Sequence, residues 1–151
     1  MLDHCVRAHA SDRSVFAALP ILQALRRDEI VGMQLDPWGP PRASADIDFC
    51  GRAASFPLGP FVISRIARAP LVPVFAVRTG IRSYELRVSD RLQPTTAAET
   101  TAAFEATVRA YEALVRERPE QWLLFEDVWR ERVAERGPYE MVPQASGLRL
   151  R

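Results

Sequence analysis

Two short apolar runs, separated by a proline-rich loop and an apolar helix, constrain what this chain can fold into. The first run, Ile30–Leu35, ends at Asp36, and the second, Leu71–Val77, ends at Arg78. Uninterrupted apolar runs of this length are typical of strands buried on both faces of a sheet. A strand, a loop with a helix and a second strand form a crossover unit. The pattern therefore predicts parallel neighbouring strands in an α/β fold, with Asp36 and Arg78 at one rim where ligands bind.

The composition is that of a soluble globular domain. The chain has 151 residues, of which 48% are hydrophobic and 26% are charged, which suits one domain with a real core. A net charge of +1 gives no global field to attract nucleic acid, so no nucleic-acid partner is expected. All 20 basic residues are arginine, which excludes a lysine Schiff base or a P-loop lysine from this sequence.

The cysteines give no sign of a disulfide framework or a metal site. Cys5 and Cys50 lack any C-x-x-C or Cys/His ligand spacing, and we interpret Cys50 as a small core residue of a strand. No apolar segment reaches the ~18 residues of a membrane span, and no secretory signal is predicted. A role at a membrane surface stays open, because it requires only an amphipathic face.

Hydrophobic periodicity and proline positions predict the other elements. They are a helix over residues 14–27 kinked at Pro20, a brief strand at Ile47 and Phe49, a helix from near Pro57–Pro60, a half-exposed antiparallel strand at Tyr84, Leu86 and Val88, a long helix capped by Thr96-x-x-Glu99, and a helix over residues 119–129. The predicted fold is α/β, a partial mixed sheet with flanking helices. It occupies residues 14–130, between a tail at 1–13 and a flexible tail at 131–151.

Two of these helices have a predicted packing face. The helix after Pro60 is expected to pack through Phe61, Ile63, Ile66 and Ala67. The long helix has an apolar stripe made of Phe104, Val108, Tyr111 and Val115. Trp122 and Trp129, seven residues apart on the last predicted helix, are interpreted as a core anchor.

Three positions invite a functional interpretation, each with a structural alternative. Asp36 either orients a polar group of a substrate or caps its own loop in an Asx-type turn. The helix start at Pro57–Pro60 either binds an anion or packs, with Gly59 allowing close approach of a ligand or a strand. Arg78 either holds a phosphate or forms an ion pair with Asp36.

Residues for nucleophilic or histidine-based catalysis are scarce. The only histidines, His4 and His9, lie in the polar N-terminal stretch and are interpreted as solvated. The serines lack a G-x-S-x-G elbow, so an α/β-hydrolase finds no support, and the sequence has no glycine-rich phosphate loop.

Several motifs, taken in order, resemble the C-terminal half of the lysophospholipid acyltransferase superfamily. The most similar branch is that of bacterial lipid A and phosphatidylinositol mannoside acyltransferases, and the resemblance runs from about residue 19 to 129. Its motifs are the strand-end Asp36, Asp48-Phe49-Cys50-Gly51-Arg52, Phe56-Pro57-x-Gly59-Pro60, Ala69-Pro70 with the run to Arg78, and Arg118-Pro119-Glu120-Gln121-Trp122.

The resemblance implies transfer of a fatty acyl chain from acyl carrier protein or coenzyme A to a hydroxyl of a glycolipid or lysophospholipid, with no bound cofactor. It also implies a peripheral location at the cytoplasmic face of the inner membrane. The membrane surface and the lipid acceptor are then the expected partners. Six positions match those that shape the acceptor side of the family's site: Asp36, Gly51, Pro57, Gly59, Pro60 and Arg78.

The family's catalytic motif, His-x4-Asp/Glu, does not occur in this sequence. Five residues after His4 comes His9, and five after His9 comes Ser14, so no catalytic residue is assigned. The family's usual residues are also replaced at Pro37, Cys50, Leu124 and Glu126.

We expect the C-terminal portion of a longer acyltransferase or a truncated homologue that cannot catalyse alone. Missing N-terminal strands would leave a sheet edge and an apolar face uncovered, so we expect them to pair with another chain, either the missing N-terminal half or a second copy, or with a membrane. The alternative is a non-catalytic lipid- or partner-binding accessory module that uses the helix 14–25 and the Trp-bearing C-terminus.

Overall fold

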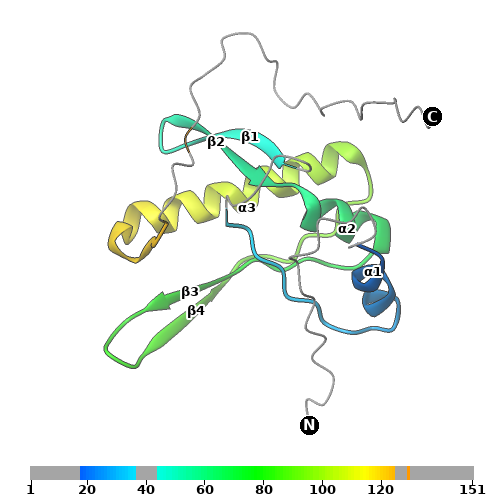
Figure 1. Ribbon diagram of the computed structural model, residues 1–151, viewed down its shortest axis with the longest axis horizontal. Helices are drawn as coiled ribbons and strands as arrows, with labels where there is room; N and C mark the ends of the chain where they lie inside the picture. The colour runs from blue at the N-terminus through cyan, green and yellow to red at the C-terminus, as the bar shows by residue number, and fades with distance from the viewer. Residues whose placement is uncertain (1–17, 37–43, 125–128, 130–151) are drawn as a thin grey trace, which may run out of the picture.

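The computed structural model describes residues 18–36, 44–124 and 129 (Figure 1). In chain order the elements are α1 (Ala18–Arg26), β1 (Ser44–Phe49), β2 (Arg52–Pro57), α2 (Gly59–Ala67), β3 (Val74–Arg78), β4 (Tyr84–Val88), α3 (Ala97–Glu117) and the 3₁₀ turn η1 (Pro119–Gln121). The predicted tails at 1–13 and 131–151, together with His4, His9 and Cys5, lie outside the described residues.

β1 and β2 form an antiparallel hairpin whose inner face supplies much of the core. The strands pair from Ser44 opposite Pro57 to Phe49 opposite Arg52. Alternation buries one face: Ala45, Ile47 and Phe49 of β1, and Ala54 and Phe56 of β2. The brief predicted strand is confirmed and is longer than expected.

Cys50 lies in the turn between β1 and β2. Cys50 and Gly51 have φ values of +56° and +85°, the conformation of a two-residue type I′ turn. Glycine suits the second of these positions because it adopts positive φ without steric cost. The prediction that Cys50 belongs to a strand is wrong: it is a partly buried turn residue that packs against the core.

The long helix α3 is capped and packed much as its sequence predicts. The Oγ1 atom of Thr96 accepts the backbone N–H of Glu99 at 3.2 Å. The Glu99 carboxylate accepts chiefly from the amide and hydroxyl of Thr95 (2.7 and 2.8 Å). The apolar stripe is confirmed, since Phe104 and Val108 are fully buried.

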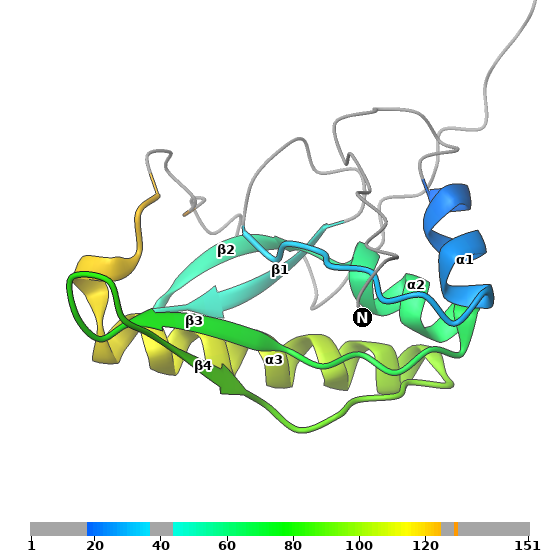
Figure 2. The same cartoon turned by 90° about the horizontal axis from the view of Figure 1, so that it is seen from below.

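The other elements are arranged around α3. Figure 1 shows the β1–β2 hairpin on one side of α3 and the β3–β4 hairpin on the other. Figure 2 shows α1 and α2 together at the N-terminal end of α3, where Phe61 packs edge-on against Phe104 with ring centroids 5.6 Å apart. The α/β class with flanking helices is confirmed.

The predicted strand over Ile30–Leu35 is wrong. Residues 29–36 form neither helix nor strand, and Ile30 is 81% exposed. The two described sheets are separate antiparallel hairpins, and no strand of either one pairs with this segment. The parallel crossover that would bring Asp36 and Arg78 to one rim is therefore not formed.

Two smaller predictions need correction, and a third falls partly outside the described residues. The kink predicted at Pro20 depends on residues 14–17, which are not described; the described part of the helix begins at Ala18. Ile66 is 55% exposed, and Ser64 is buried beside Phe61 in its place. Of the helix predicted over 119–129, the described residues form only η1, and residues 122–124 are not helical.

The antiparallel strand at Tyr84, Leu86 and Val88 is confirmed as β4. Its apolar side chains point outward instead of toward the core, each more than 60% exposed. The partner strand begins at Val74 rather than at Leu71, which forms an isolated bridge with Leu92.

Candidate functional site

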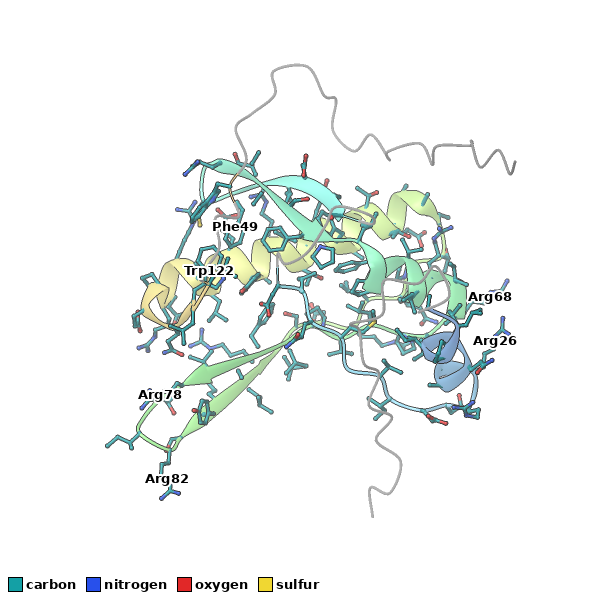
Figure 3. All side chains as sticks on the ribbon, viewed as in Figure 1. Arg26, Phe49, Arg68, Arg78, Arg82 and Trp122 are labelled. Carbon is teal, nitrogen blue, oxygen red and sulfur yellow. The ribbon has the colours of Figure 1, made fainter. Side chains whose placement is uncertain are left out.

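An aromatic cluster joins both hairpins to the C-terminal half of α3. Its members are Phe49, Phe56, Phe75, Tyr111, Trp122 and Trp129. Phe49 and Trp122, labelled in Figure 3, have ring centroids 5.4 Å apart, and Trp122 packs edge-on against Trp129 at 5.6 Å. The two tryptophans therefore anchor the core as predicted, although they do not share a helix face. The indole N–H of Trp129 also donates to the carbonyl of Phe49 at 3.1 Å.

Asp36 is joined to this cluster through Tyr111. The hydroxyl of Tyr111 donates to Oδ1 of Asp36 over a long 3.4 Å. Burial and the nearby charge of Asp36 raise the pKa of Tyr111 to about 12, so its hydroxyl stays protonated at neutral pH. The ring of Tyr111 stacks on Phe75 of β3 at 5.9 Å. Asp36 thus lies beside α3 through a side-chain contact rather than at the end of a strand.

Gly51 is positioned by a buried carboxylate, that of Glu112 on α3. Oε1 of Glu112 accepts the backbone N–H of Cys50 at 2.9 Å, which fastens the β1–β2 turn to the helix. The same carboxylate accepts from Arg116 at 2.7 Å and from Arg109 at 2.8 Å. Burial opposes its ionisation, but these hydrogen bonds outweigh it and lower the pKa of Glu112 to about 2. The carboxylate is therefore ionised throughout the neutral range.

Arg78 is held through its backbone by Gln121. The amide N–H of Arg78 donates to Oε1 of Gln121 at 2.8 Å, and Nε2 of Gln121 donates back to the Arg78 carbonyl at 2.9 Å. The side-chain amide of Gln121 thus makes the pair of hydrogen bonds that the backbone of a neighbouring strand would make at the end of β3. The guanidinium of Arg78 donates through Nε to the carbonyl of Gly80 and is otherwise exposed. Among the described residues, no ion pair joins it to Asp36.

Pro57, Gly59 and Pro60 form the junction between β2 and α2. The helix starts at Gly59 with Pro60 in its first turn, and the amides of Phe61 and Val62 bond the carbonyl of Leu58. A Cβ placed on Gly59 would meet no atom within 4 Å. Packing within the described chain therefore does not account for glycine at this position.

The six residues predicted to shape the acceptor side form two groups. Asp36 bonds Tyr111 and Arg78 bonds Gln121, while the turn that contains Gly51 is fastened to Glu112 through the amide of Cys50. The other three, at residues 57–60, lie at the opposite end of β2 from the Gly51 turn. The structure thus gathers half of the predicted set around one helix end.

Sequence reasoning missed the three side chains that do the gathering. The sequence indicates Tyr111 only as a core residue and Gln121 only as part of a motif. Glu112 lies between Arg109 and Arg116 at helical spacing, a pattern typical of a solvated helix face. Its contact with the Cys50 amide, 62 residues away, leaves no local signal in the sequence.

Within the described ranges, no group of three or more His, Cys, Asp or Glu side chains is arranged to hold a metal ion. None of the helices described is both long enough and apolar enough to cross a bilayer.

Comparison with known proteins gives one match. Residues 14–131 match the sequence model of a family described as bacterial lipid A biosynthesis acyltransferase. No curated protein and no solved structure matches the chain.

Proposed function

The chain belongs to the bacterial lipid A biosynthesis acyltransferase family, and from this we propose that it serves the transfer of a fatty acyl chain to a lipid hydroxyl. Family membership indicates an acyltransferase-type function. The proposed donor is acyl carrier protein or coenzyme A, and the proposed acceptor is a glycolipid or lysophospholipid. The observation that carries the proposal is the family match over residues 14–131, most of the 151-residue chain.

In this proposal the chain contributes the acceptor side of the site. Acyl transfer requires the acceptor hydroxyl to lose a proton as its oxygen attacks the thioester carbonyl, with the donor thiol as leaving group. The exposed guanidinium of Arg78 is suited to a phosphate of the acceptor, and the carboxylate of Asp36 to a hydroxyl or a protonated base. The unoccupied space at Gly59 supports close approach of a lipid to the backbone there.

The base that removes the proton is proposed to come from outside this sequence. The family's histidine is followed by an acidic residue after four intervening positions, and neither His4 nor His9 has this context. A polypeptide segment or a second chain that carries the motif would complete the site. Acyl transfer by the isolated chain that survives replacement of both histidines would contradict this.

We also propose a peripheral location at the cytoplasmic face of the inner membrane. A lipid acceptor is confined to a bilayer, so an enzyme acting on its headgroup has to work at the surface. A non-catalytic lipid-binding module is the second candidate, because large apolar side chains such as Leu19 on α1 are exposed. Lipid association without turnover, even when a chain carrying the base is supplied, would favour that module.

The test compares two glycines that both face open space. Gly59→Val fills the proposed approach, while Gly32→Val adds the same bulk at a position where a Cβ also meets nothing within 4 Å. We expect both variants to fold, judged by circular dichroism and thermal unfolding. Calorimetric titration with a monomeric lysophospholipid should show weaker binding for Gly59→Val only. Equal binding by both variants would remove Gly59 from the acceptor side.

A further inference from the structure

The β3–β4 hairpin exposes an apolar face that the described chain leaves uncovered. The register pairs Val74 with Val88, Ala76 with Leu86, and Arg78 with Tyr84, and these residues share one face of the hairpin. Val74, Leu86 and Val88 are 53%, 67% and 64% exposed. These three large apolar side chains are neighbours on the solvent side of the hairpin. They therefore form a continuous apolar patch and not isolated exposed residues.

The opposite face fixes the orientation of this hairpin. Val77 is only 2% exposed, and Phe75 stacks on Tyr111 of α3. Arg87 of β4 forms a two-pronged ion pair with Glu117 at the end of α3, with N–O distances of 2.6 and 3.0 Å. The apolar face is therefore turned outward by specific contacts on its other side.

Charge at the tip of the outward face is cationic. Arg78 lies on this face beside Tyr84, and Arg82 follows in the exposed tip, next to Ile81, which is 87% exposed. Figure 3 shows Arg78 and Arg82 together at the tip of the hairpin. The one carboxylate between residues 74 and 88, Glu85, lies on the opposite face, 3.3 Å from Arg87.

We propose that the outward face of the β3–β4 hairpin docks on an anionic lipid surface. Its aliphatic side chains enter the boundary between headgroups and acyl chains, while Arg78 and Arg82 extend to lipid phosphates. Tyr84 lies level with Arg78, the position at which an amphipathic ring suits a membrane interface. This inference rests on the peripheral location proposed above and assigns it to one surface of the fold.

Charge complementarity favours lipid over a head-to-head pair of two copies. In that pair the arginines of the two tips would meet, and an unpaired buried charge is strongly unfavourable. In a head-to-tail pair each tip would lie toward the base of the other copy, where the exposed Asp90 follows Val88. The dimer outcome of the test below distinguishes that pair from lipid binding. A bilayer with anionic headgroups supplies both the apolar layer and the phosphates.

The test is co-sedimentation of the full chain with vesicles of phosphatidylethanolamine and phosphatidylglycerol, against vesicles of phosphatidylcholine alone. We expect binding to the anionic vesicles that weakens as salt is raised. Arg82→Gln should weaken it about five-fold, since an arginine near such a surface contributes about that factor. The double variant Ile81→Ser, Leu86→Ser should weaken it at least about ten-fold through lost apolar burial.

Matched controls lie outside the hairpin. Arg26→Gln on α1 makes the same charge change at the other end of the molecule (Figure 3), and Ile30→Ser alters an isoleucine that is 81% exposed. Neither should change vesicle binding. The altered positions are exposed, so circular dichroism should show an unchanged fold in every variant.

Three outcomes would overturn the proposal: no preference for anionic vesicles, equal losses from the control variants, or a concentration-dependent dimer that Leu86→Ser dissociates. The lysophospholipid titration separates this proposal from the proposed function. The hairpin variants should retain binding of the monomeric acceptor, whereas Gly59→Val should lose it and keep vesicle binding.

Discussion

Replacing Glu112 by glutamine should remove a large part of the acid sensitivity of this fold. The carboxylate holds the Cys50 amide and two arginines, and its pKa is about 2 in the folded protein against an ordinary value of 4.5. This difference corresponds to at most about 3 kcal/mol of stability. The side chains of Arg109 and Arg116 are 54% and 60% exposed, so water screens the interaction. We therefore expect Glu112→Gln to lower the free energy of unfolding by about 1–2 kcal/mol at neutral pH.

The sign of the pH dependence follows from the lowered pKa. A carboxylate whose pKa is lower in the folded state contributes fully above about pH 4.5, and its contribution falls away as the pH drops toward about 2. Urea unfolding across this range should give a shallower pH dependence for Glu112→Gln than for the wild type. Some dependence should persist, because the pKa values of Glu99 and Glu117 are also lowered, chiefly by hydrogen bonds from Thr95 and from Arg87.

Glu120→Gln is the matched control, since Glu120 is an exposed carboxylate on η1 just beyond α3. It should change the free energy of unfolding by no more than about 0.5 kcal/mol and leave the pH dependence intact. If Glu112→Gln and the wild type showed the same slope between pH 2 and about 4.5, the Glu112 network would not stabilise the fold as argued.

Three further predictions concern the contacts that position the candidate site. Gly51→Ala should destabilise the chain by about 1 kcal/mol or more in thermal unfolding, because φ is +85° there; an unchanged midpoint would argue against the type I′ turn. Gln121→Ala should speed hydrogen exchange at the Arg78 amide and cost about 1–2 kcal/mol, and unaltered exchange would refute the pairing of the two residues. In an ultraviolet absorbance titration Tyr111 should ionise at about pH 12, and Asp36→Asn should lower that pKa by removing a nearby negative charge; no change would place Asp36 elsewhere.

The sequence patterns that predicted structure correctly are those whose physical cause is local. The cap at Thr96 and Glu99 satisfies amides within its own helix turn, so its residues alone indicate where α3 begins. The stripe of Phe104 and Val108 follows from helix geometry in the same way. Proline in the first turn of α2 likewise marks the helix start whatever packs around it.

The patterns that misled depend on a distant partner. Ile30–Leu35 has the composition of a buried strand, but a strand exists only where it pairs with another strand, and none of the described strands pairs with this segment. The apolar alternation of β4 correctly indicated a strand and wrongly indicated which face is covered. The periodicity shows that one face of the strand is apolar. It does not show whether another part of the protein packs against that face.

The candidate site shows the same dependence on distant contacts. Asp36 and Arg78 were expected to meet because two parallel strands would end side by side. They are instead held separately by Tyr111 and Gln121, one on the last turns of α3 and the other just beyond it. Because one anchor lies on α3 and the other on η1 directly after it, the spacing of the carboxylate and the guanidinium depends on how this end of the helix packs, not on strand register. A change at the end of α3 that leaves both residues untouched should therefore disturb acceptor recognition more than a change within the hairpins.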